Sequence, residues 1–138
     1  MSRPSLSVAN TARLEANAER GRALADLRVG KSDVADILRR ACLPEGKALR
    51  RITLVRLLSG QEEWTKRQAR ASLRFVLAIL GDRHTSDRDV DQLTIMWLID
   101  ARAGGRRARA LADVLDPKEL PPWTGFPFAV PSSRMTGR

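Results

Sequence analysis

The stretch from Thr65 to Gly81 carries apolar side chains at the three- and four-residue intervals that an α-helix places on one face. These side chains belong to Ala69, Leu73, Val76, Leu77 and Leu80. Thr65 is a favourable N-cap, because its hydroxyl can accept a hydrogen bond from a free amide of the first turn. The stretch therefore predicts a helix that buries one face in a core, with the rest of the chain packed around it.

Shorter helical patterns lie on both sides of this stretch. The proline-free, alanine-rich segment from Ser7 to Val29 predicts a long helix that projects with its first half and docks with its second, and Gly30 is typical of a helix end. Its arginines are balanced by acidic residues, so they are expected to be solvated surface. Ser32, Thr53 and Ser86 are each placed to cap a short helix. Such helices are too short to be stable alone and must pack together.

The helix expected after the third of these caps contains the apolar run from Ile95 to Ile99, which suits a helix buried on most sides. Gly104 and Gly105 then interrupt the chain and open a last helix that ends near Leu115. Residues 7 to 116 are therefore predicted to form one all-α domain, a long N-terminal helix on a small bundle.

The two ends of the chain differ from this domain. Residues 1 to 6 are expected to be flexible, whereas residues 117 to 138 form a proline-rich tail, and proline at this density excludes helix and interior strand. The tail carries Trp123, Phe126 and Phe128, which are too apolar for an idle linker. We expect them to lie in a groove of this domain or of a partner protein, so they are candidate partner-binding residues.

The charge of the chain indicates an anionic partner. The 25 Lys and Arg residues outnumber the 16 Asp and Glu residues, which gives a formal net charge of +9. The excess is regional, because residues 39 to 74 hold ten basic and three acidic side chains, whereas residues 75 to 101 hold two basic and five acidic ones. This pattern favours nucleic acid first and a membrane surface second. No stretch is apolar over the roughly 18 residues of a membrane span, so no membrane partner is predicted.

Within the basic region, a positive stripe runs beside the apolar face of the helix that starts at Thr65. Free amides at a helix start, followed by cations in the next turns, suit phosphate groups. The candidate phosphate-binding residues are Thr65, Lys66, Arg67, Arg70 and Arg74, together with Arg50 and Arg51 from the same region. The hypothesis requires that Lys66, Arg67 and Arg70 are neither engaged by carboxylates nor covered by the tail.

Residue types that catalysis or metal binding needs are missing. His84 is the single histidine and Cys42 the single cysteine, so no cluster of the two can hold zinc or haem. Glycine-rich phosphate loops do not occur, and the acidic residues from 82 to 91 lack the central glycine and final glutamate of a calcium loop. The sequence predicts a non-catalytic protein without metal or cofactor. Cys42 is expected to be buried in a short helix, and a lone cysteine indicates a reducing cytoplasm.

The region from about Asn17 to Asp100 resembles the actinobacterial integration host factor family, whose members are small, monomeric, all-helical DNA-binding proteins. The resemblance rests on AERGRALADLRVGKSDVADILRRA, and on RRITLVRLL followed by WTKRQARASL. It implies a helix-two-turns-helix element whose turn and following helix hold the DNA backbone. By position, Lys66 matches the family's lysine, and Gln68 joins the binding residues on the same helix. Thr65 stands where the family has glycine, and Arg83 matches part of a later arginine cluster.

The resemblance implies a sequence-tolerant protein that binds and possibly bends double-stranded DNA. Such a protein is nucleoid-associated in the cytoplasm or an accessory to integration, in a cell or a phage, and is expected to be a monomer. Two alternatives stay open. The same element resembles part of a small-subunit ribosomal protein, which leaves RNA or the ribosome as a partner. The chain is otherwise a protein-interaction adaptor that docks on an assembly through its aromatic tail.

Overall fold

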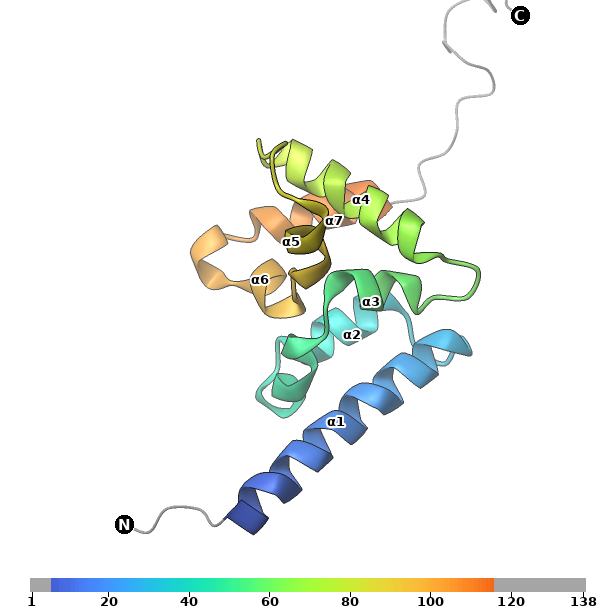
Figure 1. Cartoon of the computed structure of the whole chain (residues 1–138), viewed down its shortest axis with the longest axis vertical. Coiled ribbons are helices and arrows are strands. Elements are labelled where there is room, and N and C mark those ends of the chain that lie inside the picture. Colours follow the sequence, from blue (N-terminus) through green and yellow to red (C-terminus); the bar gives the residue numbers. More distant parts are fainter. Residues whose placement is uncertain (1–5, 116–138) are drawn as a thin grey trace, which may run out of the picture.

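The computed structural model describes residues 6 to 115, and every regular element in this range is a helix. The predicted all-α class is confirmed for this part of the chain. In order, the elements are α1 (Leu6–Arg28), α2 (Val34–Ala41), the 3₁₀ helix η1 (Pro44–Arg51), α3 (Leu54–Ser59), α4 (Lys66–Ile79), α5 (Asp87–Gln92), α6 (Ile95–Ile99), the 3₁₀ helix η2 (Ala101–Ala103) and α7 (Arg106–Leu115) (Figure 1). None of these helices has the length and apolar character that crossing a bilayer requires. The tail residues Trp123, Phe126 and Phe128 lie outside the described range.

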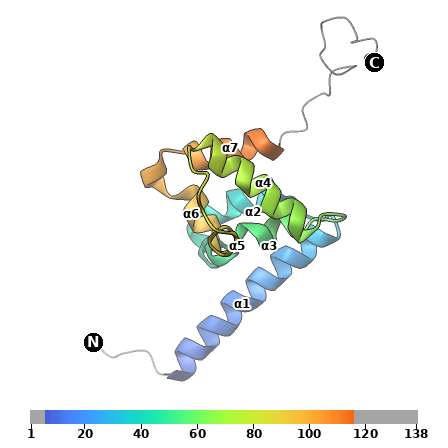
Figure 2. The ribbon, with the colours of Figure 1, turned by 45° about the horizontal axis from the view of Figure 1, so that its top comes forward.

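The first helix, α1, leaves the bundle. Residues 6 to 15 are exposed, and burial begins in the second half, where Ala23 and Leu27 join the core. Figure 2 shows the N-terminal half extending beyond the other helices. Gly30 follows the helix with a φ of +81°, a left-handed conformation that glycine adopts at little cost. The predicted projecting and docking halves are thus confirmed.

Helix α4 supplies one wall of the core, as the sequence predicts. Ala69, Leu73, Val76 and Leu77 are buried, and Leu80 is half-buried just after the helix. Both α3 and α7 pack against α4, and α2 packs against η1. Burial of one leucine side chain contributes about 1.5–3 kcal/mol. The short α-helices, of five to ten residues, are therefore held mainly by this shared core, since none of them would be stable in isolation.

Several predicted helix boundaries are confirmed. The hydroxyls of Thr53, Thr65 and Ser86 each accept a hydrogen bond from the backbone amide three residues later, so each caps the helix that follows it. Gly104 and Gly105 have φ values of +60° and +78°, and this left-handed pair separates η2 from α7.

The two ends of α2 differ from the prediction. Its N-cap is Asp33 and not Ser32, because the Asp33 carboxylate accepts a hydrogen bond from the Asp36 amide at 2.7 Å. Ser32 instead donates its hydroxyl to the Asp36 carboxylate at 2.8 Å. The prediction that Cys42 is buried is wrong. The chain leaves the helix after the buried Ala41, so Cys42 no longer follows the apolar face and is exposed.

The long helix predicted across residues 87 to 99 is two helices, α5 and α6, separated by Leu93 and Thr94. The Leu54 amide donates to the Leu93 carbonyl at 2.7 Å, and Thr94 pairs with Thr53 in an isolated antiparallel bridge. Bonds to the start of α3 thus replace those of a continuous helix. Thr94 also caps α6 through its hydroxyl, which fixes the break at this position.

Two successive turns join α3 to α4. The Gln61 amide donates to the Leu58 carbonyl at 3.3 Å, and the Trp64 amide donates to the Gln61 carbonyl at 3.2 Å. Glu63 lies in the second turn with a φ of +68°, a left-handed conformation that is uncommon for a residue with a Cβ atom. The turns set the position of the α4 N-terminus relative to α3.

Candidate nucleic-acid interface

Two of the predicted phosphate-binding residues, Thr65 and Gln68, hold the start of α4 together. The Thr65 hydroxyl accepts from the Gln68 amide at 3.1 Å, and the Thr65 amide donates to the Gln68 side-chain oxygen at 2.8 Å. This capping box satisfies free backbone amides of the first turn. Thr65 has an extended backbone with a φ of −104°, so this position does not require glycine. Both side chains are therefore engaged within the helix start rather than turned to a ligand.

The positive stripe of α4 is paired with carboxylates of α5. Arg70 donates two hydrogen bonds to Asp91, from Nε to Oδ1 at 2.9 Å and from Nη2 to Oδ2 at 2.6 Å. Lys66 Nζ lies 3.9 Å from Asp91 Oδ2, and Arg74 forms an ion pair with Asp87. The requirement that Lys66 and Arg70 are free of carboxylates is not met. This corrects the prediction that the stripe is the main phosphate contact, because antiparallel packing brings acids of α5 onto it.

The ion pairs shift the pKa values of Arg70, Asp87 and Asp91. The hydrogen bond from Arg70, assisted by its charge, lowers the pKa of Asp91, and the same bond raises the pKa of Arg70. The hydrogen bond from Arg74 likewise lowers the pKa of Asp87. Each pair sets a carboxylate against a guanidinium, and the opposite charge weakens the attraction of the stripe for an anion.

Among the predicted cations on α4 and in the loop after it, Arg67 and Arg83 are the two that the pairing leaves available. Arg67 lies in the first turn of α4, and Arg83 lies in the loop between α4 and α5. Both are exposed, and neither forms an ion pair with any other residue in the range 6 to 115. They are single cations rather than a cluster.

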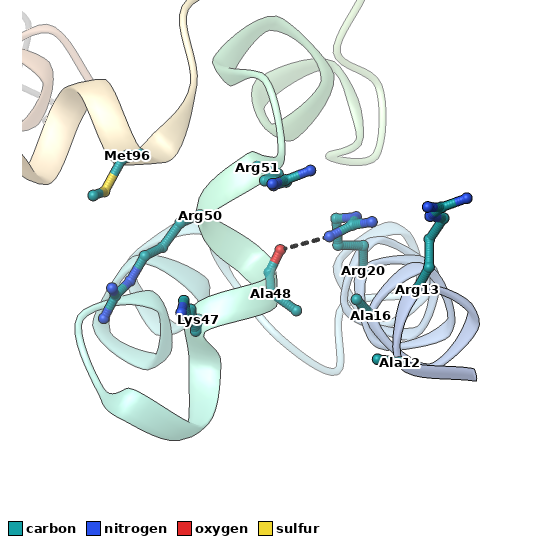
Figure 3. A pocket seen from close by; sticks show the side chains of 9 residues that line it. All are labelled: Ala12, Arg13, Ala16, Arg20, Lys47, Ala48, Arg50, Arg51 and Met96. Atoms are coloured by element: carbon teal, nitrogen blue, oxygen red, sulfur yellow. Dashed lines mark hydrogen bonds between the residues drawn. The ribbon is translucent and has the colours of Figure 1, made fainter. Parts of the chain in front are cut away.

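A groove of about 630 Å³ between α1 and η1 gathers positive charge (Figure 3). Five cations line it, Arg13 and Arg20 from α1 and Lys47, Arg50 and Arg51 from η1. No acidic side chain of the described residues lines this groove. We call it the basic groove. It includes Arg50 and Arg51, which the sequence analysis proposed. Figure 3 shows Arg51 next to Arg20 of α1, whereas the side chain of Arg50 extends from η1 to the side away from α1.

Small side chains form the floor of the basic groove. Ala12 and Ala16 of α1 lie across from Ala48 of η1, and Met96 of α6 stands at one edge. Alanine leaves open the space that a longer side chain would fill. The space between the flanking cations is therefore open to a ligand.

Two of the five arginine and lysine side chains hold the walls of the groove in place. Arg20 Nη1 donates to the Ala48 carbonyl at 3.0 Å, which joins α1 to η1, and Arg50 Nε donates to the Ala41 carbonyl at 2.7 Å. A carbonyl oxygen carries no net charge, so it does not cancel the charge of a guanidinium. Both arginines therefore contribute charge as well as structure.

The other three groove cations, Arg13, Lys47 and Arg51, are exposed. None of the three forms an ion pair with a described residue. Their ammonium and guanidinium groups are free to contact a ligand.

The position of η1 depends on a close approach at Gly46. This residue is buried, and a Cβ atom added to it would lie 1.9 Å from the Arg40 carbonyl oxygen at the end of α2. Only glycine allows this contact. Gly46 thereby places the next residues of η1, Lys47, Arg50 and Arg51, opposite α1.

Sequence reasoning missed Arg13, Arg20 and Lys47. The whole of α1 is nearly neutral, which hides how the helix separates its charges. Arg13 and Arg20 are seven residues apart and share a face, whereas Glu15 and Glu19 line a neighbouring hollow. This spacing indicated a positive face on α1, but only the position of η1 beside that face shows that the two form a basic groove.

Comparison of the chain with known family models, with curated proteins and with solved structures finds no match.

Proposed function

We propose that this chain is a non-catalytic protein that binds double-stranded DNA through the phosphate backbone, with the basic groove as its main contact. The observation that carries the proposal is the set of five cations that line one groove, in whose lining no acidic side chain of the described residues takes part. Phosphate contacts of this kind provide affinity and position and do not read bases. The binding is therefore expected to tolerate many DNA sequences.

The connection from α3 to α4 supports the resemblance to the actinobacterial integration host factor family. Two turns closed by successive backbone hydrogen bonds separate these helices. On this proposal they are the turns of a helix-two-turns-helix element. On this proposal, Arg67 at the start of α4 and Arg83 after it provide a second, weaker backbone contact beside the basic groove. A nucleoid-associated or integration-accessory role, with bending of the DNA, follows if both contacts are made by one duplex.

The proposal is tested by fluorescence anisotropy with several unrelated duplexes of equal length. Lys47→Ala and Arg51→Ala each remove one exposed groove cation, and each is expected to weaken binding about tenfold on every duplex. Arg88→Ala is the matched control, because Arg88 is exposed on α5, unpaired with other described residues, and carries the same charge. An equal loss for all three variants would show that only net charge matters and would exclude the groove.

Salt dependence gives an independent measure of the same contacts. If the five groove cations meet phosphates, the logarithm of the affinity should fall with the logarithm of the salt concentration at a slope of about −4 to −5. Each alanine variant should reduce this slope by about 1. A flat salt response of the native chain contradicts the proposal.

Structured RNA is the alternative partner, because it presents phosphates as duplex DNA does and the groove cations would contact either. Competition between equal lengths of duplex DNA and structured RNA decides between them. Stronger competition by RNA, with the same loss in Arg51→Ala, would keep the groove and change the partner.

A further inference from the structure

Helix α4 exposes two large apolar side chains that the core does not use. Phe75 is 66% exposed and Ile79 is 57% exposed, and the two stand one turn apart on the same helix face. Among the other exposed large apolar side chains of residues 6 to 115, no two stand one turn apart on the same helix. Contiguous apolar surface on a well-formed helix marks an interaction site more often than an isolated exposed residue does.

A notch beside Ile79 adds shape and charge to this surface. It has a volume of about 280 Å³ and lies between α4 and α7, lined by Ile79, Leu80 and Ala110 together with Arg106, Arg109 and Asp113. Arg106 and Arg109 are exposed and form no ion pair with a described residue. Arg106 also donates from Nε to the Ala103 carbonyl at 3.2 Å. Aromatic and arginine side chains are both enriched in protein interfaces.

This surface lies away from the basic groove. Figures 1 and 2 both place α4 and α7 on the side of the bundle opposite the projecting half of α1. A protein bound over Phe75 and Ile79 would leave the groove between α1 and η1 open. The two surfaces can therefore be occupied at the same time.

From this geometry we propose that Phe75, Ile79, Arg106 and Arg109 form a docking surface for an acidic amphipathic helix of another protein. The apolar side chains of that helix cover Phe75 and Ile79, and one of them fills the notch. Its carboxylates pair with the two arginines of α7. The occupant is defined by this charge complementarity, because an apolar helix without acids would leave the arginines unpaired.

A library of random 16-residue peptides displayed on phage, panned against the full chain, supplies the probe. The selected peptides are expected to combine apolar residues at helical spacing with Asp or Glu. The affinity of one synthesised peptide should fall at least tenfold in a Phe75→Ser, Ile79→Ser double variant and in an Arg106→Glu, Arg109→Glu double variant. Leu14→Ser is the matched control, since Leu14 is 68% exposed on α1, and it should leave the affinity unchanged. Circular dichroism of each variant verifies that it is folded.

Three results overturn the proposal. Selected peptides that lack acidic residues, or that bind the Phe75→Ser, Ile79→Ser variant within twofold of the native chain, show that this surface is not the site. Light scattering that finds a dimer of the native chain, dissociated by the same variant, assigns the surface to a second copy. A rise in peptide affinity when Trp123, Phe126 and Phe128 are all changed to alanine assigns it to the chain's own tail.

Discussion

Replacement of Gly46 by alanine tests the link between the fold and the basic groove. The backbone of Gly46 has φ −98° and ψ 16°, which residues other than glycine also adopt, so conformational freedom is not the reason for glycine here. The reason is contact. The new Cβ atom would lie 1.9 Å from the Arg40 carbonyl oxygen and 2.5 Å from its carbonyl carbon, whereas real Cβ contacts essentially never fall below 3.0 Å.

The size of the effect follows from what must move. The Arg40 carbonyl belongs to backbone and cannot rotate away, so η1 and α2 must separate by about 1 Å. Overpacking of a core costs about 1–3 kcal/mol, and a clash with backbone places Gly46→Ala near the top of that range. In a domain of about 100 residues, 3 kcal/mol corresponds to a fall in Tm of about 12–24 °C.

Gly21→Ala is the matched control, because it makes the same chemical change in a different environment. Gly21 lies within α1, and a Cβ atom there meets nothing within 4 Å. Alanine in a helix interior is more stable than glycine by about 0.5–1 kcal/mol. The two alanine substitutions should therefore shift the free energy of unfolding in opposite directions.

Thermal and urea unfolding followed by circular dichroism measure both variants. Below its transition, Gly46→Ala should also bind duplex DNA more weakly than the native chain, since η1 carries Lys47, Arg50 and Arg51. A Gly46→Ala variant within 0.5 kcal/mol of the native chain would refute the close approach of η1 to α2. The position assigned to the groove cations would then fail with it.

Other predictions follow from single contacts. The pKa values of Asp87 and Asp91 are lowered by their arginine partners, so the stability that they add is present above the ordinary aspartate pKa of about 3.9 and is lost as the pH falls through the lowered values; Asp91→Asn should reduce the drop in Tm between pH 7 and pH 3. Glu63→Gly should raise Tm slightly, because it relieves a left-handed φ of +68° that costs about 1 kcal/mol, whereas Glu63→Val should lower it. Leu57→Ala removes a fully buried side chain and should cost about 2–5 kcal/mol in urea unfolding.

The helices and the main core face were predictable because they depend on local information. The spacing of Leu73, Val76 and Leu77 indicates which side of α4 is buried. The caps at Thr53 and Thr65 indicate where two helices begin. The break at Leu93 and Thr94 was not predictable in this way. It is made by backbone hydrogen bonds to the start of α3, a segment about forty residues away in the chain.

The sequence contains a signal for the ion pairs of the α4 stripe. Arg70 and Arg74 are four residues apart, and so are Asp87 and Asp91 on the helix that follows the next turn. Two helices joined by a short loop run antiparallel, so equal spacing of opposite charges brings Arg70 to Asp91 and Arg74 to Asp87. The change from a basic to an acidic region along the chain also indicates that charges of the two regions pair with each other.

Net charge and charge location carry different information about a partner. An ion pair within the fold removes one positive and one negative charge from the surface, so it leaves the net charge of +9 unchanged. The expectation of an anionic partner therefore survives the loss of the α4 stripe. Where that partner binds depends on which cations stay unpaired, and pairing is a property of tertiary contacts. In this chain, ion pairs occupy Arg70 and Arg74, where the sequence pattern is strongest. The cations that stay unpaired and line a common groove are Arg13, Lys47 and Arg51, where α1 meets η1.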